Sequence, residues 1–364
     1  MQIKIPVYKP SLNGNEKKYV NECLDTNWIS SKGDFVGKFE KQFAEYVKTK
    51  HATSVSNGTV ALHLALVALG IGPGDEVIVP TFNYIASVNA IAYTGAKPVF
   101  VDSEREYWQI DPEAIKHKIT PRTKAILAVH LYGHPCNLER LVEIKNNHNL
   151  FLIEDCAEAL GSYYKDRHVG TLGDIATYSF YGNKTITTGE GGMVTTNDET
   201  LCDRVVHYKG QGLAKYREYW HDVIGYNYRM TNICAAIGLA QLENIEDTLI
   251  RKKQVADYYR NNLPSQVQLH GEADDCIHSY WMCTILTSEA KEREALRNHL
   301  KENGIETRPS FYPVHTMPMY SKEYERHSNA EYIGWRGINL PSYPGLSRNQ
   351  LEMITSCINS FYEG

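Results

Sequence analysis

The chain has 364 residues, 42% of them hydrophobic, and its 38 basic and 43 acidic side chains leave a formal net charge of -5. This length exceeds what one hydrophobic core usually organises, so two domains are expected. The charges form no basic stripe, which argues against a nucleic-acid partner, and no apolar run reaches the roughly 18 residues that a membrane span needs.

The first ten residues alternate polar and apolar side chains and lack the apolar core of a signal peptide. The eight cysteines form no C-x-x-C pair, and several lie in apolar stretches such as 153–159 and 232–236. Because the spacing of metal ligands is missing, no metal is predicted, and the thiols are expected to be buried and reduced. The cytoplasm, a reducing compartment, is the expected location.

Between residues 55 and 200, short β-rich runs alternate with helix-like segments. Nearly continuous apolar runs, typical of strands covered on both faces of a parallel sheet, lie at 76–80, 97–102, 124–131 and 150–154. Helices are predicted at 59–69, 84–93, 112–118 and 138–146. Gly70 and Gly95 follow two of these helices, at positions where helices commonly stop. The alternation predicts an α/β fold with a mostly parallel central sheet.

The segment from Lys209 to Asn232 is rich in aromatic residues and has little periodicity, which is typical of a binding site or an interface. A long helix is predicted near 243–262. A smaller α+β part follows, with a strand at 280–286, a charged helix at 289–302, a Pro-rich stretch and a last helix that ends near 361. We therefore predict a large domain over 1–245, which includes the N-terminal segment, and a small domain over 246–364.

Lys184 lies in the segment SFYGNKTITTGEGG, residues 179–192, between a β-rich run and a strand candidate at 193–196. Glycines there permit a ligand to approach the backbone closely. A lysine that is removed from water loses its preference for the charged form, and its amine can then attack an aldehyde. The alternative is a surface lysine beside a β-turn.

Asp155 ends the apolar run at 150–154, and ligands of open parallel sheets lie beyond the carboxyl ends of the strands. A carboxylate at this place could pair with a pyridinium nitrogen and keep it protonated. It could also cap the start of a helix.

The sequence Ser54-Val-Ser56-Asn57-Gly58-Thr59 opens an apolar helix. The free N–H groups at a helix start can hold a phosphate, although simple helix capping would use the same residue types. The helix dipole contributes only about 0.3–1 kcal/mol in exposed settings. Tight binding would therefore need hydroxyl donors such as Ser179 and a covalent link as well.

Gly58-Thr59, Asp155 and Ser179…Lys184, in this order and spacing, resemble the nucleotide-sugar (DegT/StrS-type) aminotransferases. The likeness covers almost the whole chain, including the segments at 28–33 and 308–315. It implies the aspartate-aminotransferase-like fold type I, with a large domain around a mostly parallel sheet and a smaller C-terminal α+β domain. It also implies pyridoxal 5'-phosphate as the cofactor, carried as a Schiff base on Lys184.

The resemblance implies that Lys184 and Asp155 are catalytic and that Tyr84 lies against the cofactor face. It also implies that Asn227 reaches the phosphate of the neighbouring subunit, so that a homodimer shares its active sites. Many members of the family carry His or Gln where this chain has Glu158, so that a carboxylate would interact differently with the phenolic oxygen of the cofactor. The full set of implied cofactor contacts is Ser56, Asn57, Gly58, Thr59, Tyr84, Asp155, Glu158, Ser179, Lys184 and Asn227.

The resemblance further implies L-glutamate as the amino donor and a nucleotide-linked 4-keto sugar as the acceptor. GDP-4-keto-6-deoxy-mannose, used for O-antigen polysaccharide, is favoured over UDP- or dTDP-linked sugars. The forked guanidinium of arginine suits the diphosphate of such a substrate. The candidate substrate-binding residues are Trp28, Ser30, Arg229, Arg308, Tyr312 and His315.

Two other functions are considered, a keto-sugar dehydratase and a non-enzymatic cofactor-binding scaffold. Relatives that dehydrate the same keto sugar carry a histidine where Lys184 stands, so the lysine favours amino transfer. A non-enzymatic scaffold is expected to have lost Lys184 or Asp155, and both are present.

Overall fold

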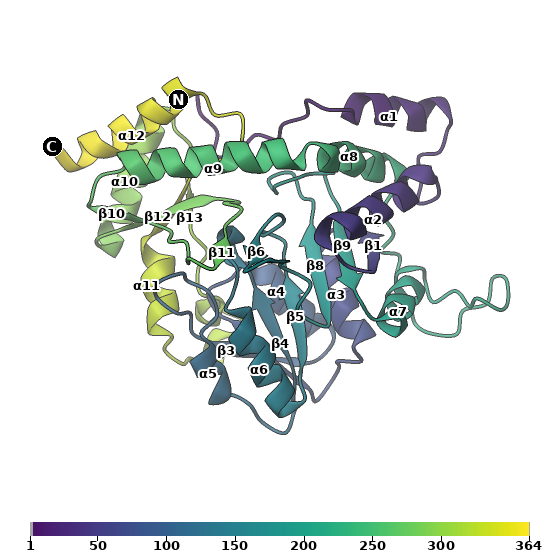
Figure 1. The fold of residues 1–364 in the computed structure, drawn as a ribbon. Helices are drawn as coiled ribbons and strands as arrows, with labels where there is room; N and C mark the ends of the chain where they lie inside the picture. Colours follow the sequence, from purple (N-terminus) through teal and green to yellow (C-terminus); the bar gives the residue numbers. More distant parts are fainter. Residues whose placement is uncertain (1–2, 364) are drawn as a thin grey trace.

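A seven-stranded sheet lies at the centre of the larger part of the molecule (Figure 1). The computed structural model describes residues 3–363, so Met1, Gln2 and Gly364, at the outer ends of the two predicted domains, lie outside the described residues. Among the described strands of this sheet, β9 alone runs against its neighbours, and the pairs that connect β8 to β3 are all parallel. The predicted mostly parallel sheet is thus confirmed. Its strands, in spatial order, are β1 (His51–Val55), β9 (Gly192–Thr196), β8 (Ile175–Ser179), β5 (Phe151–Asp155), β4 (Thr123–Val129), β2 (Glu76–Pro80) and β3 (Lys97–Val101).

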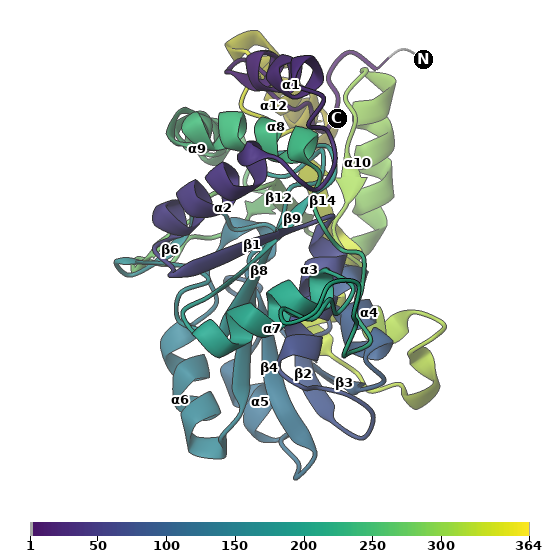
Figure 2. The ribbon, with the colours of Figure 1, turned by 90° about the vertical axis from the view of Figure 1, so that its right-hand side faces the viewer.

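Helices cover both faces of this sheet, and Figure 2 shows α6 on one side and α4 on the other. Side chains alternate between the faces along each strand. Ile78 therefore packs in one hydrophobic cluster, whereas Val77 and Val79 pack in another. The first cluster includes α2 (Asp34–Val47), α5 (Pro112–Lys116), α6 (Leu138–His148) and α8 (Asn232–Glu243). The second includes α3 (Gly58–Ala68), α4 (Ile85–Tyr93) and α7 (Glu199–Lys209). The N-terminal helix α1 (Glu16–Asp25) packs on α8.

The smaller part contains an antiparallel sheet in the order β10 (Val267–Leu269), β12 (Cys283–Thr287), β14 (Gly337–Leu340) and β13 (Arg308–Pro309). A third hydrophobic cluster joins this sheet to α9 (Ile245–Asn262), α10 (Ala290–Glu302) and α12 (Arg348–Glu363), while α11 (Ser328–Arg336) packs between the parts. Three short strands, β6 (Tyr163–Tyr164), β7 (Arg167–His168) and β11 (Cys276–Ile277), form a small sheet that links the two parts. The 3-10 turns are η1 (Leu131–Gly133), η2 (Val314–Thr316) and η3 (Ser321–Glu323).

The chain crosses between the two parts at both ends of the predicted large domain. Ile5 bridges Ile305 and packs in the third cluster. At the other end, α9 runs from the first cluster, where Ile245 lies, to the third cluster, where Tyr259 lies (Figure 1). The division into 1–245 and 246–364 stays a prediction.

Most predicted elements agree with the observed ones to within two residues, and Gly70 and Gly95 adopt positive φ values of 78° and 83° after their helices. The predicted helix at 243–262 is two helices, because α8 ends at Glu243 and α9 begins at Ile245. The strand predicted at 280–286 begins only at Cys283, since Tyr280 has φ 49° and its N–H donates to Nδ1 of His278.

All eight cysteines carry free thiols. The predicted burial is confirmed for Cys23, Cys136, Cys156, Cys283 and Cys357, whereas Cys202, Cys234 and Cys276 are partly exposed. No helix within residues 3–363 is long and apolar enough to cross a membrane.

Candidate functional site

Predicted catalytic and cofactor-binding residues lie at the carboxyl ends of β5 and β8. Asp155 is the last residue of β5 and Ser179 the last of β8, and these two strands pair in parallel. Because parallel strands end at the same edge of a sheet, both side chains lie at one edge, as predicted for Asp155. Lys184 follows five residues after Ser179, in the turn between β8 and β9.

The start of α3 packs tightly against the end of β8. A Cβ atom at Gly58 would lie 2.6 Å from Cβ of Ser179, and one at Gly192 would lie 2.5 Å from the carbonyl oxygen of Asn57. The side chain of Asn57 caps the helix by accepting from the N–H of Val60. The amides of Gly58 and Thr59 are in the first helical turn, where N–H groups have no acceptor within the helix. This arrangement suits a phosphate, beside the hydroxyl of Ser179.

Asp155 is buried and holds two hydrogen bonds. The hydroxyl of Ser87 donates to its Oδ2 at 2.7 Å, and the N–H of Ala157 donates to its Oδ1 at 3.1 Å. The residues after Asp155 form a turn, so it caps no helix. Burial raises the pKa of Asp155, against the hydrogen bond from Ser87 and the nearby charge of Lys184.

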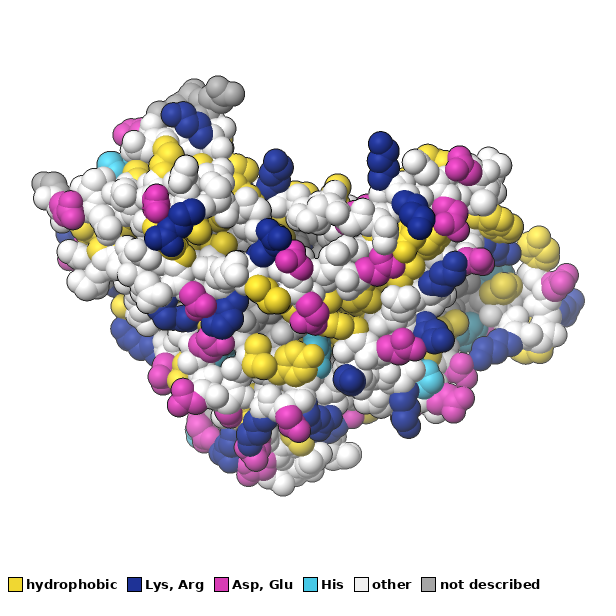
Figure 3. Space-filling view, turned by 45° about the horizontal axis from the view of Figure 1, so that its top comes forward, with side chains coloured by type: hydrophobic (Ala, Val, Ile, Leu, Met, Phe, Trp, Pro, Cys, Tyr) yellow, Lys and Arg dark blue, Asp and Glu magenta, His cyan; other side chains and the backbone are white. Residues whose placement is uncertain are grey.

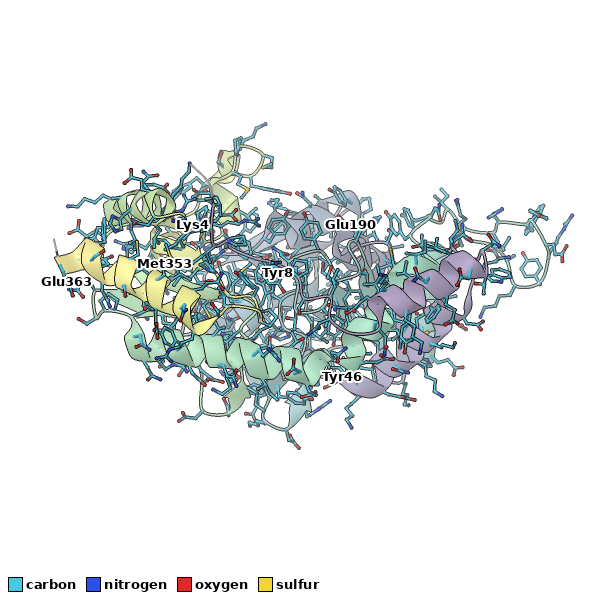
Figure 4. The ribbon with its side chains drawn as sticks, turned by 90° about the horizontal axis from the view of Figure 1, so that it is seen from above. Lys4, Tyr8, Tyr46, Glu190, Met353 and Glu363 are labelled. Carbon is cyan, nitrogen blue, oxygen red and sulfur yellow. The ribbon has the colours of Figure 1, made fainter. Side chains whose placement is uncertain are left out.

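Lys184 is held within the site through its backbone and its side chain. The hydroxyl of Tyr8 donates to the carbonyl oxygen of Lys184 at 2.7 Å. Viewed from above, Tyr8 lies near the middle of the molecule, between Lys4 and Glu190 (Figure 4). Burial lowers the pKa of the Lys184 amine, whereas the carboxylates of Glu158 and Asp155 act to raise it. A lysine in such a place can act as a nucleophile and proton carrier.

Glu158 is the acidic neighbour of the lysine amine. Its Oε1 lies 3.6 Å from Nζ of Lys184, and its Oε2 accepts from the N–H of Tyr132 at 2.8 Å. Burial raises the pKa of Glu158 to about 7, while Lys184 acts to lower it. This carboxyl group can therefore exchange a proton near neutral pH.

An aromatic wall adjoins the amine. The ring of Tyr84 lies 5.7 Å from that of Phe311, and the rings of Tyr132, Trp281 and Phe311 are nearly parallel to one another. Tyr84 itself is more than half exposed, at 57%, so its ring is open to a ligand. The wall thus provides an aromatic surface next to Lys184.

The residues present fit pyridoxal phosphate. The close approach at Gly58 and Gly192 leaves first-turn amides and a hydroxyl for a phosphate, and Lys184 supplies an amine for the aldehyde. Asp155 has lone pairs left for a pyridinium N–H. Nδ2 of Asn83, which lies close to Ser87, is buried without a hydrogen-bond partner among the described residues and can serve a ligand.

The predicted partner-subunit residue, Asn227, is exposed and accepts from the guanidinium of Arg229 through its Oδ1 at 3.1–3.2 Å. The neighbouring Tyr228 carbonyl accepts from the N–H of Ser56 in the same chain. Asn227 and Arg229 close the base of an arm, residues 210–227, whose ends pair at Gly210 and Asn227. The arm projects from the body beside α7 (Figure 1).

The predicted substrate-binding residues differ in solvent exposure. Trp28, Ser30 and Arg308 are exposed, and the backbones of Trp28 and Ser30 accept hydrogen bonds from Asn232. Tyr312 is exposed at the surface, where its ring lies 5.2 Å from Trp335.

His315, by contrast, is buried. Its Nδ1 lies 2.7 Å from the hydroxyl of Thr81, and its Nε2 lies 3.3 Å from Glu331. Since both ring nitrogens have protein partners, His315 fixes the loop that carries Tyr84. Its role toward a sugar stays a prediction, as do those of the other substrate residues.

A buried group of His130, Glu154 and Cys156 has metal-binding side chains within 4.8 Å of one another. Hydrogen bonds account for it without a metal. The N–H of Cys136 donates to Nδ1 of His130, so Nδ1 is an acceptor and Nε2 of the ring donates to Glu154 at 3.0 Å. Glu154 also accepts from the amides of the turn at 170–173.

Four contact residues were not predicted from the sequence: Tyr8, Ser87, Tyr132 and Trp281. Each lies far along the chain from the residue it contacts, and Trp281 was interpreted only as part of a strand. A buried aromatic residue within a predicted strand carries no local signal of function.

The sequence profile of the DegT/DnrJ/EryC1/StrS aminotransferase family matches residues 10–359. The chain is 66% identical to GDP-perosamine synthase of Escherichia coli O157:H7 over 358 residues, 98% of each protein. It is 50% identical to GDP-perosamine synthase of Vibrio cholerae over 363 residues, 98% of this chain and 99% of the relative. The structure of Spr1654 from Streptococcus pneumoniae in its PLP form is similar, with a TM-score of 0.93 and 26% identity over 100% of this chain and 99% of that one.

Proposed function

The chain belongs to the DegT/DnrJ/EryC1/StrS aminotransferase family, and on that premise we propose that it transfers the amino group of L-glutamate to C4 of GDP-4-keto-6-deoxy-D-mannose. The products are GDP-perosamine and 2-oxoglutarate. The protein is a transaminase, and pyridoxal phosphate is its cofactor.

One observation carries the choice of substrate: the 66% identity to a GDP-perosamine synthase extends over 98% of both chains. Two further proteins of that name, from Vibrio cholerae and Caulobacter vibrioides, match at 50% and 47% identity. These names support a GDP-linked sugar as substrate over UDP- or dTDP-linked sugars.

The chain's own residues support amino transfer. Bound pyridoxal phosphate supplies an electron sink for the bond-breaking step. Ser179 and the first turn of α3 would hold its phosphate, and Asp155 would hold its ring nitrogen. The Lys184 amine, whose pKa burial lowers, moves protons as a general base. Because Lys184 is present, dehydration of the keto sugar is not favoured.

We also propose that two chains form a homodimer with shared active sites. The arm exposes large apolar side chains, including Tyr219 at 93% and Ile224 at 89% of their surface. Figure 3 shows the arm as a lobe that stands out from the body, with hydrophobic side chains among charged ones. Exposed apolar surface of this kind usually marks an interface, and Asn227 at the base of the arm would contact the partner's phosphate. We propose the reducing cytoplasm as the location, supported by eight free thiols.

The test of the reaction uses the purified protein with L-glutamate and a panel of GDP-, UDP- and dTDP-linked 4-keto sugars. We expect the GDP-linked sugar to be aminated at C4 with the highest kcat/KM. Faster amination of a UDP- or dTDP-linked sugar would overturn the substrate assignment. Separately, borohydride should fix the cofactor on the peptide that contains Lys184, and cofactor fixed elsewhere would overturn the role of that lysine.

A further inference from the structure

The amine of Lys184 lies against the face of an indole ring. Its Nζ is 4.0 Å from the ring centre of Trp281, and Oε1 of Glu158 is 3.6 Å from the same nitrogen. Trp281 is 4% exposed and the Lys184 side chain 13%, so both contacts are made away from bulk water. The face of an indole is the negative pole of its quadrupole and attracts an ammonium group, more strongly where water is excluded.

Trp281 is held in this orientation from several sides. Its Nε1–H donates to the carbonyl oxygen of Asn183, the residue before Lys184, at 2.7 Å. Its plane is within 13° and 16° of the rings of Tyr132 and Phe311. At Gly133, which has φ 102°, a Cβ atom would lie 3.1 Å from the backbone nitrogen of Trp281, so this glycine permits the close approach.

A second buried lysine fixes the backbone of Trp281. Lys252 of α9 is fully buried, and its ammonium donates to the carbonyl oxygens of Trp281 and Ser342 at 3.1 and 3.0 Å. It has no carboxylate partner among the described residues, and burial lowers its pKa to about 8. A buried ammonium group without a carboxylate partner costs free energy unless it is hydrogen-bonded. The two bonds from Lys252 therefore hold the backbone at Trp281 and Ser342 in place.

We propose that the indole face of Trp281 and the carboxylate of Glu158 hold the Lys184 amine whenever that amine is free, which makes Trp281 a further catalytic residue. The inference rests on the proposed function, in which this amine is alternately bonded and free. The two contacts keep the free amine beside the reacting atoms and favour its return.

The charges around the amine set the expected effect of losing the ring. Burial lowers the pKa of Lys184, and the facing carboxylates of Glu158 and Asp155 oppose that effect. The indole face also stabilises the ammonium form. Removal of the face should therefore lower the pKa of Lys184 and increase its uncharged fraction at neutral pH.

The experiment compares Trp281→Leu and Trp281→Phe in the full-length protein after removal of the cofactor. Acetic anhydride labels uncharged amines, and peptide mass spectrometry follows the labelling of Lys184 across pH. With Trp281→Leu we expect labelling at neutral pH to rise roughly twofold to thirtyfold, the range from an exposed to a desolvated cation–π contact. Trp281→Phe keeps an aromatic face but loses the N–H, and its profile should stay close to that of the original protein.

Tyr258→Leu is the matched control, because it removes a ring that Arg348 covers at 4.4 Å on the smaller part, and it should leave the Lys184 profile unchanged. An unchanged profile in Trp281→Leu, or equal shifts in the Leu and Phe variants, would overturn the proposal. If Trp281→Leu does not fold, Trp281→Met decides in the same way, because methionine also lacks an aromatic face and must increase labelling, whereas Glu158→Gln tests the carboxylate contact alone. Borohydride fixation of the cofactor on Lys184 is measured in a separate experiment. Failure of the proposed function would appear in that experiment, whereas failure of the Trp281 proposal would appear only in the labelling profile.

Discussion

Burial governs the chemistry of individual residues in the site. Asp155, Glu158 and Lys184 lie within one small buried region, and for each of them desolvation is the largest influence on the pKa. Desolvation raises the pKa of both carboxyl groups and lowers that of the amine. The charge of Lys184 opposes the rise in the pKa of both carboxyl groups, and their charges oppose the fall in the pKa of the amine. The pKa of Glu158, about 7, suits this group to proton transfer near neutral pH.

Asp155→Asn tests whether the carboxylate charge matters beyond its hydrogen bonds. Asparagine preserves the shape and can still accept from Ser87, but it cannot keep a ring nitrogen protonated. We expect the cofactor to bind while the glutamate half-reaction slows by at least about a hundredfold, or ~2.7 kcal/mol. Single-turnover absorbance measures that step, and near-normal rates would mean that Asp155 only caps the turn at Ala157.

At the scale of elements, the phosphate site depends on how closely α3 approaches β8 and β9. The helix start and the strand ends are brought together at two glycines, Gly58 and Gly192, where any Cβ atom would collide with Ser179 or with the backbone of Asn57. The amides of the first helical turn thereby come beside the Ser179 hydroxyl. A donor set assembled from two elements, α3 and β8, binds an anion more tightly than a helix end alone.

Gly58→Ala should weaken cofactor binding. Its new Cβ would lie 2.6 Å from Cβ of Ser179 and 2.9 Å from Oγ, so the helix start must move away from the strand. We expect the dissociation constant for pyridoxal phosphate, measured by absorbance titration, to rise at least about tenfold, or ~1.4 kcal/mol. Gly37→Ala, in α2, is the control, because nothing lies within 4 Å of its added methyl group. Equal affinities in the two variants would show that the close approach is not needed for phosphate binding.

At the scale of the whole molecule, a chain of buried histidines joins the two parts. The N–H of Tyr280 donates to Nδ1 of His278, so the proton of this neutral ring lies on Nε2 and is donated to Nδ1 of His270. His270 then donates from Nε2 to the carbonyl oxygen of Tyr107. All four ring nitrogens of His270 and His278 take part in hydrogen bonds, so neither ring can accept an additional proton without losing one. Trp281 is the residue after Tyr280, whose N–H donates to His278.

The histidine chain predicts a loss of stability in acid. Burial lowers the pKa of His270 to about 3 and that of His278 well below 6.5. Between pH 6.5 and about 4, the unfolded chain binds protons that the folded one does not, so stability falls as pH falls. Each such histidine contributes about 1.4 kcal/mol per pH unit to that slope.

His270→Gln provides the measurement, because glutamine can make both hydrogen bonds without titrating. In urea unfolding between pH 6.5 and 4, we expect the slope of the unfolding free energy against pH to decrease by about 1.4 kcal/mol per unit. His148→Gln, at the exposed end of α6, should keep the original slope. A slope unchanged by His270→Gln would place the acid sensitivity elsewhere.

The proposal of a homodimer with shared active sites predicts complementation between two inactive proteins. Lys184→Ala and Asn227→Ala are refolded together, so that a mixed dimer contains one site with both changes and one with neither. Activity should reappear at up to about half per mixed dimer. Each variant refolded alone is the control. Mixed dimers as inactive as their parents would mean that Asn227 acts within its own chain.

The sequence by itself determined the features that short stretches of chain encode. Apolar runs predicted the strands β2, β3, β4 and β5, and the Ser-Asn-Gly-Thr segment predicted the start of α3 to within one residue. Asp155 and Lys184 could be singled out because each stands next to a local pattern, a strand end or a glycine-rich turn. The short strands of the smaller part were not predicted, because a strand of two to four residues is too short to show a hydrophobic periodicity.

Only the tertiary structure decided which residues surround the lysine amine. Ser87 contacts Asp155 across 68 positions of sequence, Trp281 reaches Asn183 across 98, and Tyr8 reaches Lys184 across 176. No local pattern encodes such pairs, because each results from the packing of whole elements. The pKa values of Glu158 and Lys184 depend on the same packing, since burial, their largest influence, exists only once the two parts of the chain have closed around them.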